Sequence, residues 1–140
     1  MSRTKEQSSK QMPSTGLNLD FSASPEVWNF LQSNAFVRGM MGPVGSGKSY
    51  ACAAEIMMRA VKQKPSPIDG IRYSRFAIVR NSYPMLKTTT IKTWIDLFPE
   101  STFGPLLWTP PITHHIKLPS RGDAAGIDCE VIFLALDQPK

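Results

Sequence analysis

Eight consecutive residues, 42–49, have the types and spacing needed to bind phosphate groups. Their sequence is Gly42-Pro43-Val44-Gly45-Ser46-Gly47-Lys48-Ser49, which fits the phosphate-binding (Walker A) pattern G-x-x-x-x-G-K-[ST] at every position. Glycines let the backbone turn tightly, so that several N–H groups point at one phosphate. The lysine can bridge the β- and γ-phosphates, and the serine hydroxyl can ligate Mg²⁺. The pattern therefore predicts binding of ATP with Mg²⁺, with Lys48 as a catalytic residue and Ser49 as a metal ligand.

Such a loop needs a strand before it and a helix after it. An apolar run over residues 35–41, interrupted by Arg38 and Gly39, predicts the strand. Strong helix formers and the absence of proline predict a helix from Gly47 to about Gln63. The positive end of that helix would face the phosphates. A glycine-rich turn that matches the pattern by chance is the alternative, and both flanking predictions weigh against it.

Alternating strands and helices in the first 100 residues predict an α/β fold with a mainly parallel sheet flanked by helices. Ser24-Pro25-Glu26 has the composition of a helix start. Further strands are predicted at 73–80, 112–118 and 129–136, and a further helix at 83–97, which the β-branched run Thr88-Thr89-Thr90 weakens.

Length and composition fit one globular domain. The chain has 140 residues, of which 41% are hydrophobic and 19% charged. No stretch approaches the roughly 20 apolar residues of a membrane-spanning helix, and the N-terminus has no apolar core of a secretory signal. A cytoplasmic location without membrane contact is the default expectation.

Residues 1–17 are polar and predict a disordered tail. Cys52 and Cys129 lack metal-ligand spacing and are both predicted to be buried thiols.

Positive charge is concentrated in the middle of the chain. The formal net charge is +5, and residues 59–92 hold eight basic residues against one acid, Asp69. Such an excess attracts polyanions, nucleic acid or nucleotide phosphates among them. A solvated basic face without a partner is an equal alternative. The basic residues are Arg59, Lys62, Lys64, Arg72, Arg75, Arg80, Lys87 and Lys92.

ATP hydrolysis also needs an acid at the end of another strand, and Asp137 is the internal candidate. It follows the apolar residues 131–136, but Gln138 rather than a glutamate comes next, so no adjacent catalytic base follows. An aspartate at a strand end is also a common turn residue, which is the competing interpretation.

Adjacent His114 and His115 would point to opposite faces of a strand, so a surface or strand role is predicted for them rather than a shared metal ion.

Several large apolar residues near the loop are predicted to pack in the core. Adenine contact is the alternative for the aromatic residues just before the loop. The residues are Trp28, Phe30, Phe36, Met40, Met41, Met57 and Met58.

A second block is more discriminating than the loop. Residues 76–94, FAIVRNSYPMLKTTTIKTW, form a strand ending in Arg-Asn, then Tyr-Pro and a Thr-rich helix with Trp. Together with residues 42–49 and the later 128–133, DCEVIF, this block resembles the N-terminal ATPase region of the large terminase subunit of tailed bacteriophages. The resemblance covers about residues 18–140, which it identifies as the N-terminal part of a P-loop ATPase domain.

The resemblance implies a viral genome-packaging motor in the host cytoplasm. Large terminase subunits hydrolyse ATP to move double-stranded DNA into a capsid; they act as a homo-oligomeric ring at the capsid portal, and a small terminase subunit chooses the DNA. Arg80 would sit near the nucleotide or a subunit interface and stabilise the γ-phosphate, with a structural ion pair or the basic face as equal alternatives. The family's magnesium acid and catalytic glutamate lie on a later strand, beyond Lys140. Asp137 would then be a loop residue, and the isolated chain a weak or inactive ATPase.

Two other functions stay open on the sequence alone. One is an unrelated P-loop ATPase or a nucleotide kinase, although a kinase needs an arginine-rich lid and only Arg121 follows residue 80. The other is a non-catalytic fragment that binds nucleotide without turnover, which the missing acid-glutamate pair favours.

Overall fold

The computed structural model describes residues 24–42 and 47–137. The predicted tail, residues 1–17, and four loop residues, Pro43, Val44, Gly45 and Ser46, lie outside the described residues. The elements in chain order are α1 (Pro25–Gln32), α2 (Lys48–Val61), β1 (Arg72–Arg80), α3 (Tyr83–Met85), a π-helical turn η1 (Leu86–Thr90), α4 (Ile91–Leu97), α5 (Glu100–Phe103), β2 (Leu106–Leu107), β3 (Ile112–Leu118) and β4 (Ile127–Ala135).

The four strands form one open mixed sheet in the order β1-β4-β3-β2. Only β1 and β4 are parallel, with Arg72 opposite Ile127 and Arg80 opposite Ala135. Strand β3 runs antiparallel to both β4 and β2. The prediction of a mainly parallel sheet is therefore wrong. A short turn, in which Arg121 pairs with Ala124, joins β3 to β4, and so short a connection permits only antiparallel pairing.

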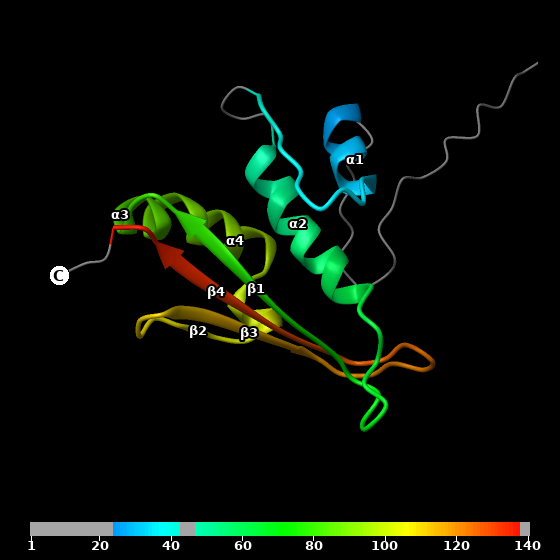
Figure 1. The fold of residues 1–140 in the computed structure, drawn as a ribbon. Coiled ribbons are helices and arrows are strands. Elements are labelled where there is room, and N and C mark those ends of the chain that lie inside the picture. The colour runs from blue at the N-terminus through cyan, green and yellow to red at the C-terminus, as the bar shows by residue number, and fades with distance from the viewer. Residues whose placement is uncertain (1–23, 43–46, 138–140) are drawn as a thin grey trace, which may run out of the picture.

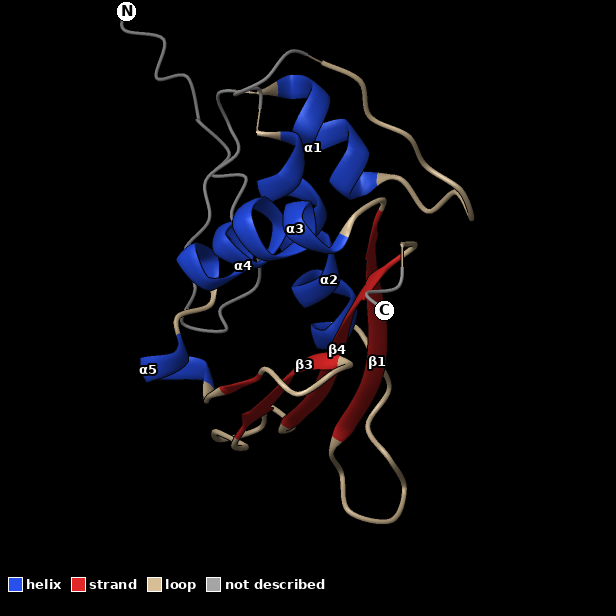
Figure 2. Cartoon of the chain, turned by 90° about the vertical axis from the view of Figure 1, so that its left-hand side faces the viewer, coloured by secondary structure: helices blue, strands red, loops and turns tan. Residues whose placement is uncertain are grey.

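The helices cover one face of this sheet (Figures 1 and 2). Side chains along β4 alternate, and Ile127, Cys129, Val131 and Phe133 are buried beneath the helices. Trp94 of α4 lies at the centre of this core, with its ring centroid 5.8 Å from that of Phe133. Period-two burial along β4 thus confirms that the apolar run is a strand buried on one side.

Residues 35–41 form no strand, which corrects the prediction for the segment before the phosphate-binding loop. Phe36 is 103% exposed and Met41 98%, so the predicted core positions of these two residues are also wrong. The physical reason lies in Arg38, whose guanidinium pairs with Glu55 of α2 and holds the segment against the helices rather than against the sheet. Met57 and Met58 are buried as predicted.

The predicted helix over residues 83–97 is confirmed, but it is not uniform. Elements α3, η1 and α4 follow one another without interruption, and the π-helical turn contains the run Thr88-Thr89-Thr90. The Thr88 hydroxyl donates a hydrogen bond to the carbonyl of Pro84 over 2.8 Å. Hydroxyls that bond back to the preceding turn loosen the regular helical ladder, which accounts for the change of pitch at this run.

Candidate phosphate-binding site

Gly47 and Lys48 form the junction between the candidate loop and α2. Gly47 caps the helix with a left-handed backbone, φ 83°, which side-chain-bearing residues rarely adopt. A Cβ built at this position meets no heavy atom of the described residues within 4 Å. Backbone conformation rather than lack of space therefore explains why the position is a glycine.

A hydrogen bond from the Lys48 side chain joins the two ends of the candidate loop. The Lys48 ammonium donates this bond to the carbonyl of Gly42, which joins the first residue of the motif to the seventh. The first hydrogen bond of α2 runs from the N–H of Ala51 to the carbonyl of Gly47 over 2.9 Å. The N–H groups before Ala51 have no partner inside the helix, and no acid occupies its first turn. These groups, with the Lys48 ammonium, give this end of α2 a positive potential that suits an anion.

Helix α2 begins at the end of the sheet where the parallel strands β1 and β4 finish (Figures 1 and 2). In open α/β sheets, ligands bind outside the carboxyl ends of the strands. Lys48 and the exposed Ser49 therefore lie at the end of the sheet that suits a ligand. A left-handed glycine, a helix start without acids and a hydroxyl suit a magnesium-bound phosphate, whereas the strand expected before such a loop is absent from residues 35–41.

Arg80 is the last residue of β1, so it lies at this same end of the sheet. Its Nε atom is buried and has no hydrogen-bond partner among the described residues. Arg80 is also absent from the ion pairs found in residues 24–42 and 47–137. The geometry thus gives no support, within these residues, to the alternative of a structural ion pair.

Asp137 follows β4, and its carboxylate is already engaged. One carboxylate oxygen accepts a hydrogen bond from the backbone N–H of Tyr83 over 2.7 Å. Its own N–H donates to the carbonyl of Asn81 over 3.2 Å. Asp137 therefore caps the start of α3, which matches the interpretation of this residue as a loop aspartate rather than a magnesium ligand.

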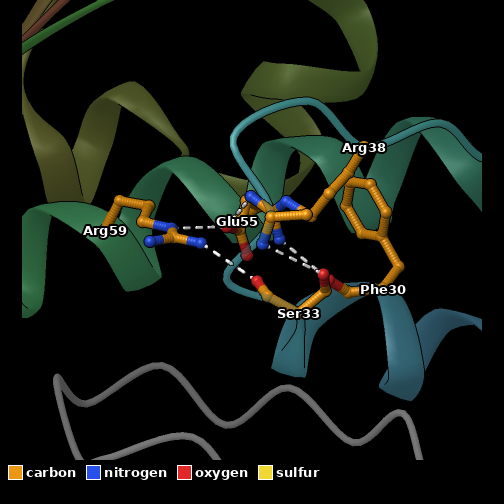
Figure 3. A network of polar contacts seen from close by, with 6 residues as sticks. Phe30, Ser33, Arg38, Glu55 and Arg59 are labelled. Carbon is orange, nitrogen blue, oxygen red and sulfur yellow. Dashed lines mark hydrogen bonds and ion pairs between the residues drawn. The ribbon is translucent and has the colours of Figure 1, made fainter.

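A buried ion-pair network that the sequence analysis missed supports the chain before the loop (Figure 3). Glu55 of α2 receives hydrogen bonds from Arg38 and, over 2.7 Å, from Arg59. Arg38 also donates to the carbonyl of Phe30 over 2.8 Å, and its guanidinium lies 4.8 Å from the centroid of the Phe30 ring. Arg59 donates to the carbonyl of Ser33 over 3.2 Å. One carboxylate thus ties α2 to the end of α1 and to the segment that follows it.

This network has a direct consequence for the site. Arg38 precedes Gly42 by four residues, so the contact with Glu55 constrains the position of the chain just before the candidate loop. The pair of Glu55 and Arg59 could have been predicted from the sequence, because the two residues are spaced i, i+4 on one helix. Arg38 gave no such signal, since it interrupts an apolar run.

The eight basic residues of 59–92 are divided between structural and exposed roles. Arg59 pairs with Glu55, and Arg75 pairs with Glu130 across the sheet. Arg72 donates to the carbonyls of Val61 and Ala125 and so joins the start of β1 to two loops. The exposed members without an ion pair among the described residues are Lys62, Lys64, Lys87 and Lys92, and Arg75 is exposed although it is paired.

His114 and His115 lie on opposite faces of β3, as predicted. The indole N–H of Trp94 donates to Nδ1 of the buried His114 over 2.8 Å, and Nε2 lies 2.9 Å from the carbonyl of Gly104. Burial lowers the pKa of His114 below its usual value, with the hydrogen bond to Gly104 opposing the shift. His115 on the exposed face pairs with Asp128. No cluster of metal-ligating side chains occurs in the part of the chain that the structure describes.

The two cysteines differ from each other. Cys129 is buried in β4, as predicted, and burial raises the pKa of its thiol. Cys52 is exposed, which contradicts the prediction of a buried thiol. Its neighbours Ala51 and Ala53 are buried, and Cys52 lies on the side of α2 that faces away from them. Neither thiol forms a disulfide.

The chain matches no protein-family model, no curated protein and no solved structure. Among the described residues, every helix is too short or too polar to cross a membrane. A functional assignment therefore depends on the residues themselves and on their geometry at the end of the sheet.

Proposed function

We propose that residues 42–49 bind the phosphates of ATP with Mg²⁺, and that this chain is the ATP-binding part of a viral DNA-packaging motor of the large terminase type. The observation that carries the proposal is the junction at Gly47 and Lys48. There a complete phosphate-loop motif, a left-handed glycine and the positive end of a helix coincide.

Each residue of the site has a separate task in this proposal. The N–H groups at the start of α2 donate to phosphate oxygens, for which the helix end is already oriented. The Lys48 ammonium exchanges its hydrogen bond with Gly42 for one with the phosphates and offsets their charge. The Ser49 hydroxyl would hold Mg²⁺, which would offset the charge of the phosphates. Bound Mg·ATP supplies the phosphoanhydride bond whose hydrolysis powers the motor.

Arg80 links the phosphate site to the packaging motor in this proposal. It ends β1 within the block of residues 76–94 that resembles large terminase subunits, and its Nε lacks a partner among the described residues. A guanidinium without a carboxylate partner is suited to stabilise charge on a γ-phosphate, either in its own subunit or in the next one of a ring. The proposed partners of the full motor are double-stranded DNA, a small terminase subunit and the capsid portal.

Nucleotide binding without turnover is the second candidate for this chain, and the geometry of Asp137 favours it. Because the carboxylate of Asp137 accepts the N–H of Tyr83, it is committed to capping a helix. A chain that relies on Lys48 and Ser49 without a second acid would hold Mg·ATP but hydrolyse it slowly.

Isothermal titration calorimetry with Mg·ATP tests the proposal. A charge-assisted hydrogen bond is worth about 1.5–3 kcal/mol, so Lys48→Ala should weaken binding by roughly ten- to a hundredfold. Lys62→Ala, which removes an exposed lysine after the other end of α2, is the matched control and should bind like the wild type. Unchanged affinity in Lys48→Ala would refute the phosphate-loop assignment. Turnover of bound ATP by the wild type would exclude the second candidate.

A further inference from the structure

A groove separate from the phosphate-binding site lies between the helix of residues 83–97 and the loop that follows β2. It has a volume of about 400 Å³ and is lined by Lys87, Lys92 and Trp108, with Ile91, Ile95, Thr88 and Asp96 completing the lining. Figure 1 shows α4 packed above the sheet, with β2 at the sheet's far edge from β1. The groove thus combines two ammonium groups, one carboxylate and an aromatic ring.

The π-helical turn places both lysines in this groove. Residues five apart on a regular α-helix point about 140° away from each other, since each residue turns the helix by about 100°. Lys87 lies in η1 and Lys92 in α4, and the wider turn between them brings both to the same groove. Such turns are rare and frequently occur at functional sites.

Trp108 supplies an exposed aromatic surface beside these charges. It is 47% exposed, although burial of its ring would be favourable. The Lys87 ammonium lies 5.9 Å from the centroid of the Trp108 ring and 5.4 Å from that of Tyr83. In residues 24–42 and 47–137, neither Lys87 nor Lys92 forms an ion pair. Both ammonium groups are therefore available to an anion that approaches the ring.

We infer that this groove binds an unpaired stretch of nucleic acid, with phosphates at Lys87 and Lys92 and a base stacked on Trp108. Single-stranded nucleic acid is the polyanion that carries a flat aromatic group beside each phosphate, so it matches both halves of the groove. A duplex presents its phosphates but keeps its bases stacked inside, and would leave Trp108 unused. The inference goes beyond the proposed function, because the proposed motor moves double-stranded DNA, whereas the charges and the ring of this groove suit an unpaired strand.

Fluorescence anisotropy with a labelled oligothymidine of about ten nucleotides, at several salt concentrations, tests the inference. Affinity falls as salt rises, and each phosphate contact contributes about 0.7 to the steepness of log affinity against log salt. The loss of two contacts in Lys87→Gln/Lys92→Gln should therefore reduce this steepness by about 1.4. Trp108→Ala should weaken binding about tenfold, the value typical of one stacked base, whereas Trp108→Phe should retain most of the affinity. A labelled duplex of the same length should bind more weakly than the single strand.

The matched control is Lys62→Gln/Lys64→Gln, which removes the same charge from two exposed lysines after α2. An equal loss of slope in both double variants would overturn the inference, because binding would then depend on net charge alone. Unchanged affinity in Trp108→Ala, or duplex binding as tight as single-strand binding, would overturn the stacking role. Lys48→Ala separates the two proposals: it should keep oligothymidine binding while it loses Mg·ATP.

Discussion

Replacement of Glu55 by glutamine tests whether the network of Figure 3 anchors the chain before the phosphate-binding loop. The substitution preserves the size of the side chain and removes its charge. The side chains of Glu55 and Arg38 are only 10% and 15% exposed, whereas that of Arg59 is 35% exposed. Arg38 would therefore lose its buried counter-ion, and Arg59 would lose a partner that water replaces in part.

The expected loss of stability follows from the two ion pairs. Both arginines stay charged and can keep a hydrogen bond to the amide oxygen of glutamine, so each loses only the attraction of the carboxylate charge, about 1 kcal/mol. The exposure of Arg59 reduces its share, which leaves a total of about 1.5–2 kcal/mol. For a domain of this size, a loss of that magnitude lowers Tm by about 6 °C.

Thermal unfolding followed by far-ultraviolet circular dichroism measures this shift. The control is Glu130→Gln, which removes the same charge from an ion pair whose Arg75 side chain is 72% exposed. An exposed pair of this kind contributes about 0.5 kcal/mol or less, so Tm should fall by no more than about 2 °C. Equal shifts in the two variants would refute the anchoring role of Glu55. Mg·ATP affinity should fall in Glu55→Gln and stay constant in Glu130→Gln.

Three other substitutions test separate parts of the account. Gly47→Ala should weaken Mg·ATP binding about fivefold, since a left-handed backbone at a side-chain-bearing residue costs about 1 kcal/mol, and calorimetry would measure it. The pKa of His114 is lowered in the folded chain, so the unfolded chain binds the proton first and stability is lost as pH falls below about 6.5. Urea unfolding should show a larger loss between pH 7 and pH 5 for the wild type than for His114→Gln, and parallel losses would contradict the assignment. Asp137→Ala should cost about 1 kcal/mol in the same assay, because the N–H of Tyr83 loses its acceptor, and should leave Mg·ATP affinity unchanged.

Much of the fold follows from local sequence patterns. Consecutive apolar residues located β1 and β4, a strand was also predicted at β3, and a serine and a proline with an early acid located the start of α1. The helix after the loop was predictable because its residues are strong helix formers without proline. These signals arise within a few residues of one another, so no knowledge of distant contacts was needed.

The failures at residues 35–41 and at the groove depend on partners far apart in the sequence, whereas the direction of β3 follows from a local feature. Residues 35–41 are apolar enough for a strand, but the pairing of Arg38 with Glu55 takes the segment away from the sheet. The direction of β3 depends on its short connection to β4. For the site, the sequence identified Gly47, Lys48 and Ser49 as motif residues, whereas the groove depends on the approach of Trp108 to the helix of residues 83–97, which no local pattern encodes.

If residues 42–49 hold the phosphates of a nucleotide, the amide chemical shifts of this segment should change when the nucleotide binds. Two-dimensional ¹H–¹⁵N spectra of the labelled chain would be recorded during titration with Mg·ATP. The largest shift changes are expected at Gly42, Gly47, Lys48 and Ser49, and small changes at Gly122 in the distant turn between β3 and β4. Shift changes that are absent, or that are centred away from the start of α2, would contradict phosphate binding by residues 42–49.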